Sequence, residues 1–83
     1  MQIPVDRTLA QLGRRQRARV RDVVGDDDLA RRLVDQGLWP GVEVELLTAA
    51  PGGDPLLFVL HGFRLALRRD EAARVRVDAE PAS

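Results

Sequence analysis

The chain has 83 residues, and 45% of them are hydrophobic, which is enough for one small core and excludes an intrinsically disordered chain. Thirteen basic residues, all arginine, balance thirteen acidic ones, so no overall field draws the protein toward nucleic acid or an anionic membrane. The absence of cysteine excludes disulfides and thiolate chemistry. No apolar run approaches the roughly 18 residues that cross a bilayer and no signal sequence is recognisable, so the expected location is cytoplasmic.

The first predicted elements are a short helical turn and a half-buried strand. Thr8 and Gln11 have the spacing of a capping box, and Gly13 is expected to supply a left-handed exit from the turn. Over residues 17–24, Ala18, Val20 and Val24 fall on one parity and Arg17, Arg19 and Arg21 on the other, which predicts a strand with one buried face.

A helix of about nine residues, 28–36, is expected next. Residues 26–28 are three consecutive aspartates, which suit the N-terminal cap and the positive end of the helix dipole. Gly37 fits the C′ position of a Schellman cap, in which Leu38 folds back on Leu33. Gly37 and Leu38 are therefore expected to end the helix.

The remaining sequence reads as turns and short strands. Trp39-Pro-Gly-Val42 suits a type II turn with positive φ at Gly41, and His61-Gly62 suits the type I′ turn of a hairpin. Strands are expected over 42–48, 56–60, 64–68 and 74–77, with one helical turn over 70–73.

Five short antiparallel strands with one inserted helix predict a mainly β fold, a small, strongly bent sheet closed into a barrel. So few residues cannot form two separate sheets, and closure would hide the strand edges. We expect a single domain over residues 1–78 and a flexible tail over 79–83.

The segment Arg31-Arg-Leu-Val-Asp-Gln-Gly-Leu-Trp-Pro-Gly41 carries a family resemblance. Together with a leading Leu-x-x-Leu-Gly that begins at Leu9 and a late Leu-Ala-Leu-Arg that begins at Leu65, it resembles the FeoA domain over nearly the whole chain. The resemblance implies a small SH3-like barrel and a freestanding cytoplasmic protein that accompanies the ferrous iron transporter FeoB. The same domain forms the C-terminal module of iron-dependent repressors.

By that resemblance the chain would be a non-enzymatic regulator that binds the cytosolic, GTP-hydrolysing region of FeoB. The expected docking surface is the helix exit, formed by Arg31, Arg32, Leu38, Trp39 and Pro40. Trp39 has a second interpretation, in which it folds over the barrel end and packs on Leu38. The structural glycines of turns and caps are Gly13, Gly37, Gly41 and Gly62.

Two other functions stay open at this point. A basic stripe of Arg17, Arg19 and Arg21, with Arg14 and Arg15 just before them, could bind a phosphate backbone in an SH3-like nucleic-acid-binding module. If their strand pairs with 42–48, however, Glu43 and Glu45 would meet these arginines, so no nucleic acid is expected.

The second alternative is a metal-sensing domain of repressor type. One histidine and no cysteine argue against a zinc or ferrous site within the chain, so neither a metal nor a cofactor is expected. His61 has no nucleophile near it in sequence, so we expect no enzymatic activity. The sequence leaves the oligomeric state open.

Overall fold

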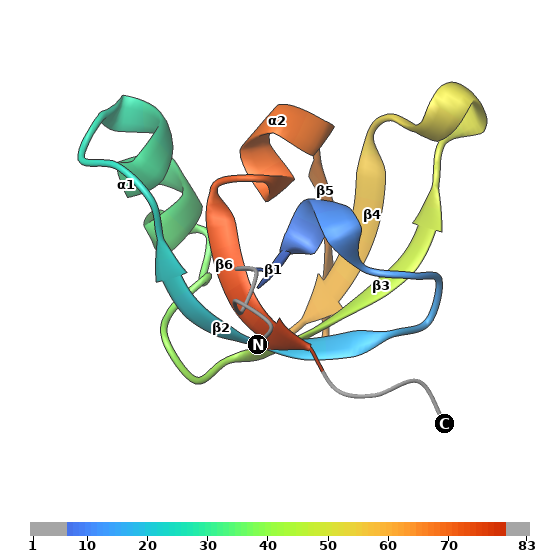
Figure 1. Cartoon of the computed structure of the whole chain (residues 1–83), viewed down its shortest axis with the longest axis horizontal. Coiled ribbons are helices and arrows are strands. Elements are labelled where there is room, and N and C mark those ends of the chain that lie inside the picture. Colours follow the sequence, from blue (N-terminus) through green and yellow to red (C-terminus); the bar gives the residue numbers. More distant parts are fainter. Residues whose placement is uncertain (1–6, 80–83) are drawn as a thin grey trace, which may run out of the picture.

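The structure is a computed structural model that describes residues 7–79. Within this range a single antiparallel sheet carries the fold, with strand order β1-β6-β2-β3-β4-β5 (Figure 1). The strands are β1 Arg7–Thr8, β2 Arg17–Val23, β3 Glu43–Ala49, β4 Leu56–Leu60, β5 Phe63–Leu67 and β6 Val75–Ala79. The helical elements are η1 Leu9–Gln11, α1 Asp28–Asp35, η2 Pro51–Gly53 and α2 Arg69–Ala72.

The mainly β class with an inserted helix is confirmed, but the described part of the chain forms six strands rather than five. The sixth is β1, which spans two residues and pairs with β6. The expected closure is wrong, because β1 and β5 are the two edges of the sheet and do not pair with each other. β1 continues into η1 and β5 leads into α2, and these two helical turns contact each other. Helical turns thus meet at the open side of the sheet, where a closed barrel would have a hydrogen-bonded ladder (Figure 1).

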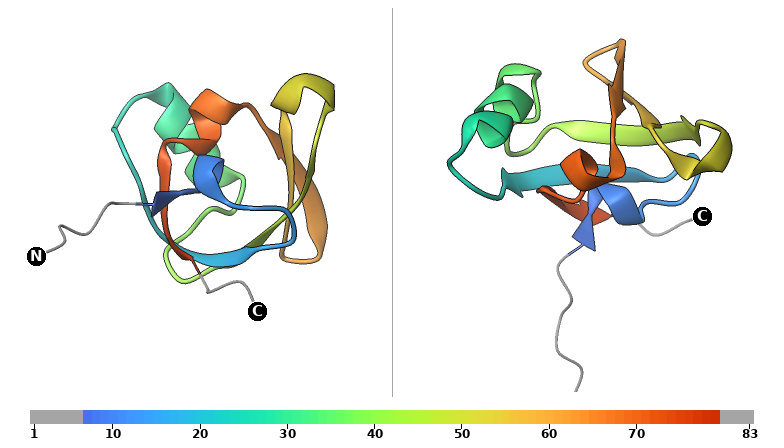
Figure 2. Two further views of the ribbon diagram at one scale, coloured as in Figure 1. Left: turned by 45° about the vertical axis from the view of Figure 1, so that its right-hand side comes forward. Right: turned by 90° about the horizontal axis from the view of Figure 1, so that it is seen from above.

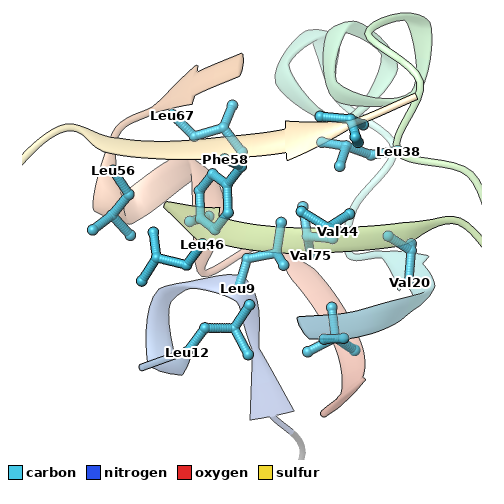
Figure 3. Packing of buried hydrophobic residues seen from close by; sticks show 14 of the residues in the cluster. Leu9, Leu12, Val20, Leu38, Val44, Leu46, Leu56, Phe58, Leu67 and Val75 are labelled. Atoms are coloured by element: carbon cyan, nitrogen blue, oxygen red, sulfur yellow. The ribbon is translucent and has the colours of Figure 1, made fainter. Parts of the chain in front are cut away.

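The core lies on the concave side of the bent sheet (Figure 3). Its centre is Phe58, which is fully buried on β4. The predicted alternation places inward side chains from β2, β3 and β4, and η1 contributes Leu9 and Leu12. The largest fully buried side chains are Phe58, Leu9, Leu33, Leu38, Leu56, Leu67, Val44 and Val75. No charged or polar side chain of the described residues is buried.

Two expectations for the N-terminal half are corrected. Gly13 has no positive φ; the turn after η1 takes its left-handed residue at Arg15, with φ 67°, while Gln16 N–H donates to the Gly13 carbonyl. The predicted strand over 17–24 is one residue too long, since β2 ends at Val23. The pairing of β2 with β6 also shifts between Val20 and Asp22. This bulge changes which side chains point inward, so Val24 is 43% exposed.

At the C-terminus, Ala79 belongs to β6, so the expected flexible tail begins one residue too early. Residues 80–83 of that tail lie outside the described residues, as do residues 1–6 of the expected 1–78 domain.

Candidate functional site

The exit of α1 is a Schellman cap, as predicted. Gly37 N–H donates to the Val34 carbonyl at 2.9 Å, Leu38 N–H donates to the Leu33 carbonyl at 3.3 Å, and Gly37 has φ 103°. The helix ends at Asp35, one residue before the expected end. Leu38 was expected at the docking surface, but it is fully buried in the core and therefore not accessible to a partner.

The next turn holds Trp39 at the surface. Val42 N–H donates to the Trp39 carbonyl at 3.1 Å and Gly41 has φ 91°, as a type II turn requires. Gly41 N–H also donates to the Val20 carbonyl at 2.7 Å, which ties the turn to β2. Pro40 is exposed beside Trp39.

Trp39 is exposed but fixed in orientation. Its side chain is 51% exposed, so it does not fold away over Leu38. The indole Nε1–H donates at 2.7 Å to the Val34 carbonyl, which also accepts from Gly37 N–H in the Schellman cap. The ring therefore presents a large apolar face to solvent in a defined position.

The β4–β5 hairpin brings two more rings to Trp39. Its two-residue turn has positive φ at both His61 and Gly62, 53° and 79°, as predicted for type I′. The His61 ring lies 5.4 Å from the Trp39 ring and 6.1 Å from that of Phe63, which is 44% exposed. His61 Nε2 lies 3.2 Å from the Gly37 carbonyl oxygen, within hydrogen-bond distance.

We call Trp39, His61 and Phe63 the aromatic corner. Trp39 was expected at the site from the sequence, but His61 and Phe63 were not, since they are distant from it in sequence. The available signal was a two-residue turn followed directly by an aromatic residue, in a chain with few aromatics.

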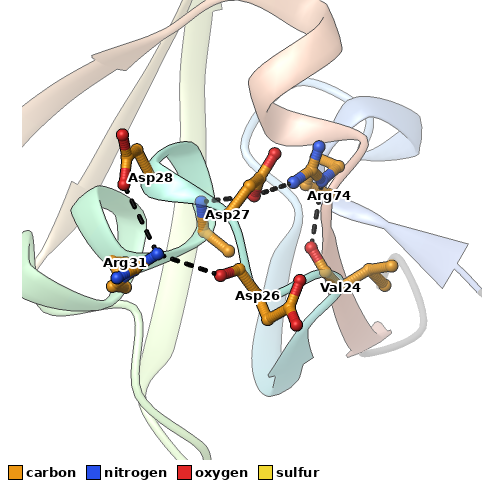
Figure 4. A network of polar contacts seen from close by, with 7 residues as sticks. Val24, Asp26, Asp27, Asp28, Arg31 and Arg74 are labelled. Atoms are coloured by element: carbon orange, nitrogen blue, oxygen red, sulfur yellow. Dashed lines mark hydrogen bonds and ion pairs between the residues drawn. The ribbon is translucent and has the colours of Figure 1, made fainter.

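The two arginines of the expected docking surface have partners within the chain. Arg31 lies 3.4 Å from a carboxylate oxygen of Asp28 and donates to the Asp26 carbonyl at 3.2 Å (Figure 4). Arg32 lies 2.6 Å from a carboxylate oxygen of Glu71 in α2. Of the five expected docking residues, Arg31 and Arg32 thus form ion pairs within the chain and Leu38 is buried. Trp39 and Pro40 are uncharged and exposed.

The basic stripe lies on β2, which pairs with β3, so the pairing with Glu43 and Glu45 considered from the sequence is present. Arg17 lies opposite Glu45 and Arg19 opposite Glu43 in the sheet register. The side-chain contacts include Arg15 with Glu45 at 3.4 Å, Arg17 with Glu43 at 4.0 Å, Arg19 with the Gly41 carbonyl at 3.2 Å and Arg21 with Asp78 at 3.7 Å. Acidic neighbours thus offset much of the positive charge of the stripe.

The aspartates before α1 cap the helix, as predicted. Asp27 Oδ1 accepts from Ala30 N–H at 3.2 Å and also from the Arg74 guanidinium, whose Nε donates to the Val24 carbonyl (Figure 4). The hydrogen bond from Arg74 lowers the pKa of Asp27 below its usual range. In the same way, the hydrogen bond from Arg76 lowers the pKa of Asp22.

A shallow groove of about 200 Å³ runs beside α1. It is lined by Val23, Gly25, Asp26, Ala30, Arg31, Val34 and Asp35. Over the described range, no group of three or more His, Cys, Asp or Glu side chains could hold a metal ion. No helix in residues 7–79 is long and apolar enough to cross a membrane.

A small, bent sheet of short antiparallel strands with an inserted helix belongs to the SH3-like class of fold. A sequence model described as the FeoA domain matches residues 7–79, and the chain belongs to this family, which is linked to ferrous iron transport. The resemblance seen in the sequence is thereby confirmed. No curated protein gives a significant match.

Several solved structures share the fold. The FeoA of Stenotrophomonas maltophilia, a procaryotic SH3 domain protein solved with zinc, is 41% identical with a TM-score of 0.78, over 87% of this chain and 89% of that one. The FeoA-like protein of Clostridium acetobutylicum is 26% identical with a TM-score of 0.87, over 98% of this chain and 94% of that one. The IdeR of T. acidophilum, at 20% identity and a TM-score of 0.78, matches in fold over 96% of this chain and 37% of its own.

Proposed function

We propose that this protein is a cytoplasmic, non-enzymatic accessory protein of ferrous iron uptake. It would bind the cytosolic, GTP-hydrolysing region of the FeoB transporter through the aromatic corner. Family membership supports the link to ferrous iron transport, and the S. maltophilia relative is described in terms of ferrous iron transport activation.

The observation that supports the proposed surface is that Trp39 is exposed and fixed in orientation. A half-exposed tryptophan leaves apolar area in water that a partner would cover, and tryptophan is enriched at interface hot spots. Because its Nε1–H is already bonded to the Val34 carbonyl, the side chain loses little rotational freedom on binding. The rings of His61 and Phe63 extend the apolar area beside it.

The docking surface expected from the sequence is accordingly revised. Arg31 and Arg32 pair with Asp28 and Glu71, and Leu38 is in the core. The revised surface keeps Trp39 and Pro40 and adds the two hairpin residues of the aromatic corner. Within residues 7–79 we find no feature that favours nucleic-acid binding or metal sensing as a second function.

The test is calorimetric titration of the purified cytosolic region of the FeoB protein from the same organism. We expect Trp39→Ala to weaken binding about 30-fold or more, the effect of losing a hot-spot side chain of about 2 kcal/mol. Val24→Ala is the matched control, because Val24 is also an exposed apolar residue but lies just after the end of β2. Equal affinity of the wild-type and Trp39→Ala proteins would reject the surface, and no binding by the wild-type protein would reject the partner.

A further inference from the structure

The outer side of β5 has no hydrogen-bonded neighbour in residues 7–79. β5 pairs with β4 over five consecutive residues without a bulge, and none of its backbone groups bonds to any described element other than β4. In the left view of Figure 2 this strand lies at the rim of the molecule. The opposite edge strand, β1, spans only two residues, so β5 is the longer free edge.

The hairpin geometry determines which backbone groups face outward. Leu60 and Phe63 flank a two-residue turn and form a hydrogen-bonded pair, and such pairs alternate along an antiparallel ladder. Phe63, Leu65 and Leu67 therefore bond to β4. Arg64 and Ala66 direct their N–H and C=O groups away from it, which leaves two donors and two acceptors with the spacing of a strand.

Charge determines what could pair with this edge. Arg64 and Arg68 are exposed, and neither has an acidic partner among the described side chains. A second copy of the chain added antiparallel would bring its own Arg64 to the same face, and these like charges disfavour self-pairing. A strand with acidic side chains on that face would be attracted instead.

The two faces of β5 differ, so they would select an alternating sequence. Phe63 and Leu65 are on the core-facing side, where Leu65 packs against the core and Phe63 is half-exposed. Arg64 and Ala66 are on the opposite, exposed side. An added strand would place apolar residues beside Phe63 and Leu65 and acidic residues beside Arg64.

We propose that the free edge of β5 is a strand-addition site for an extended peptide in which acidic residues alternate with apolar ones. Backbone hydrogen bonds to Arg64 and Ala66 supply affinity, and the charge of Arg64 selects the acidic sequence. The inference goes beyond the proposed function, because it concerns the chemistry of the bound segment and holds whichever protein provides it.

The first test uses a capped six-residue peptide of alternating valine and glutamate and the ¹⁵N-labelled protein. We expect saturable amide shifts that are largest at Arg64 and Ala66. A peptide with lysine in place of glutamate should bind more weakly. A peptide N-methylated at its glutamates should not bind, because the residues opposite Arg64 and Ala66 lose the N–H groups that pair with β5.

Two variants make the test specific. Arg64→Glu should weaken binding of the glutamate peptide about fivefold and reverse the preference toward the lysine peptide. Ala66→Pro removes an outward N–H without touching the β4 ladder, and should weaken binding about tenfold. Arg64→Glu changes only an exposed side chain, so it remains informative if the proline variant folds poorly.

Three results would overturn the inference: shifts that do not map to β5, unchanged binding of the N-methylated peptide, or no preference between glutamate and lysine. Concentration-dependent shifts at β5 without peptide would also overturn it, since they would identify a second copy as the occupant. Phe63 belongs to both surfaces, but the transporter experiment is read at Trp39, which is not on β5, so the two failures can be told apart.

Discussion

The guanidinium of Arg32 and the carboxylate of Glu71 lie 2.6 Å apart and join α1 to α2. Glu71 uses its second oxygen to accept from Arg68 N–H at 2.8 Å, which caps α2, and its side chain is only 17% exposed. One carboxylate therefore orients both helices, and an arginine expected at the docking surface has a structural contact.

Removal of either member of this pair should lower stability modestly. Because Arg32 is largely exposed, we expect Arg32→Ala and Glu71→Gln each to cost about 1 kcal/mol, which is roughly 5 °C in Tm for a domain of this size. Thermal unfolding of both single variants and the double variant measures the coupling. Strictly additive losses would show that the pair contributes nothing, and transporter binding should be unaffected by Arg32→Ala.

The two phenylalanines provide a matched comparison of burial. Phe58 is fully buried, so Phe58→Ala should cost about 3–5 kcal/mol and leave much of this small protein unfolded. Phe63→Ala removes a half-exposed ring and should cost less than about 1 kcal/mol. Urea denaturation of the two variants checks the contrast, and equal losses would contradict the burial described here.

Two glycines allow a similar comparison for the backbone. Gly37→Ala places a Cβ at φ 103° and 3.1 Å from His61 Cδ2, so we expect a loss of about 2 kcal/mol. Gly13→Ala has neither constraint, since Gly13 lacks a positive φ and its nearest atom would be 3.7 Å away. It should change stability by less than about 1 kcal/mol in either direction. A large loss in Gly13→Ala would revive the left-handed exit predicted from the sequence.

Acid should weaken the protein through two carboxylates. Hydrogen bonds from Arg76 and Arg74 lower the pKa values of Asp22 and Asp27 from 3.8, so the folded state releases these protons more readily than the unfolded state. Their stabilisation is therefore present above pH 3.8 and lost as the pH falls through the lowered folded pKa values.

The check is urea unfolding at pH 7 and at a pH below 3.8. The double variant Asp22→Asn, Asp27→Asn keeps an N-cap residue but lacks both charges, so its stability should fall less between the two pH values. If wild-type and variant lose equal stability on acidification, these two ion pairs are not the cause.

The features predicted correctly from sequence are those set by neighbouring residues. The Schellman cap at Gly37 and the type I′ turn at His61 depend on local φ preferences, which residue identity reports directly. β1 was missed because two residues carry no periodicity, and its strand character depends on pairing with β6. The closure error has the same origin, since no local signal shows whether the first and last strands of a sheet meet.

The site was only partly predictable for a similar reason. Trp39 was conspicuous as the chain's one tryptophan, but its exposure depends on a hydrogen bond to Val34 and on the turn's attachment to Val20. The pairing of Arg32 with Glu71 joins residues 39 positions apart, and helical spacing alone gave no indication of it.

The contact of His61 with the Gly37 carbonyl joins two turns that are 24 residues apart. Each turn has the minimum length for its type, so the aromatic corner should accept changes of side chain but not of chain length. One residue inserted at His61–Gly62 would shift β5 by one position and turn Leu67 out of the core. Insertions should instead be tolerated near Gly52 in η2, where the nearby chain is exposed and open space surrounds the glycine. That loop, rather than the aromatic corner, is therefore where a fluorescent protein or affinity tag can be placed with least disturbance.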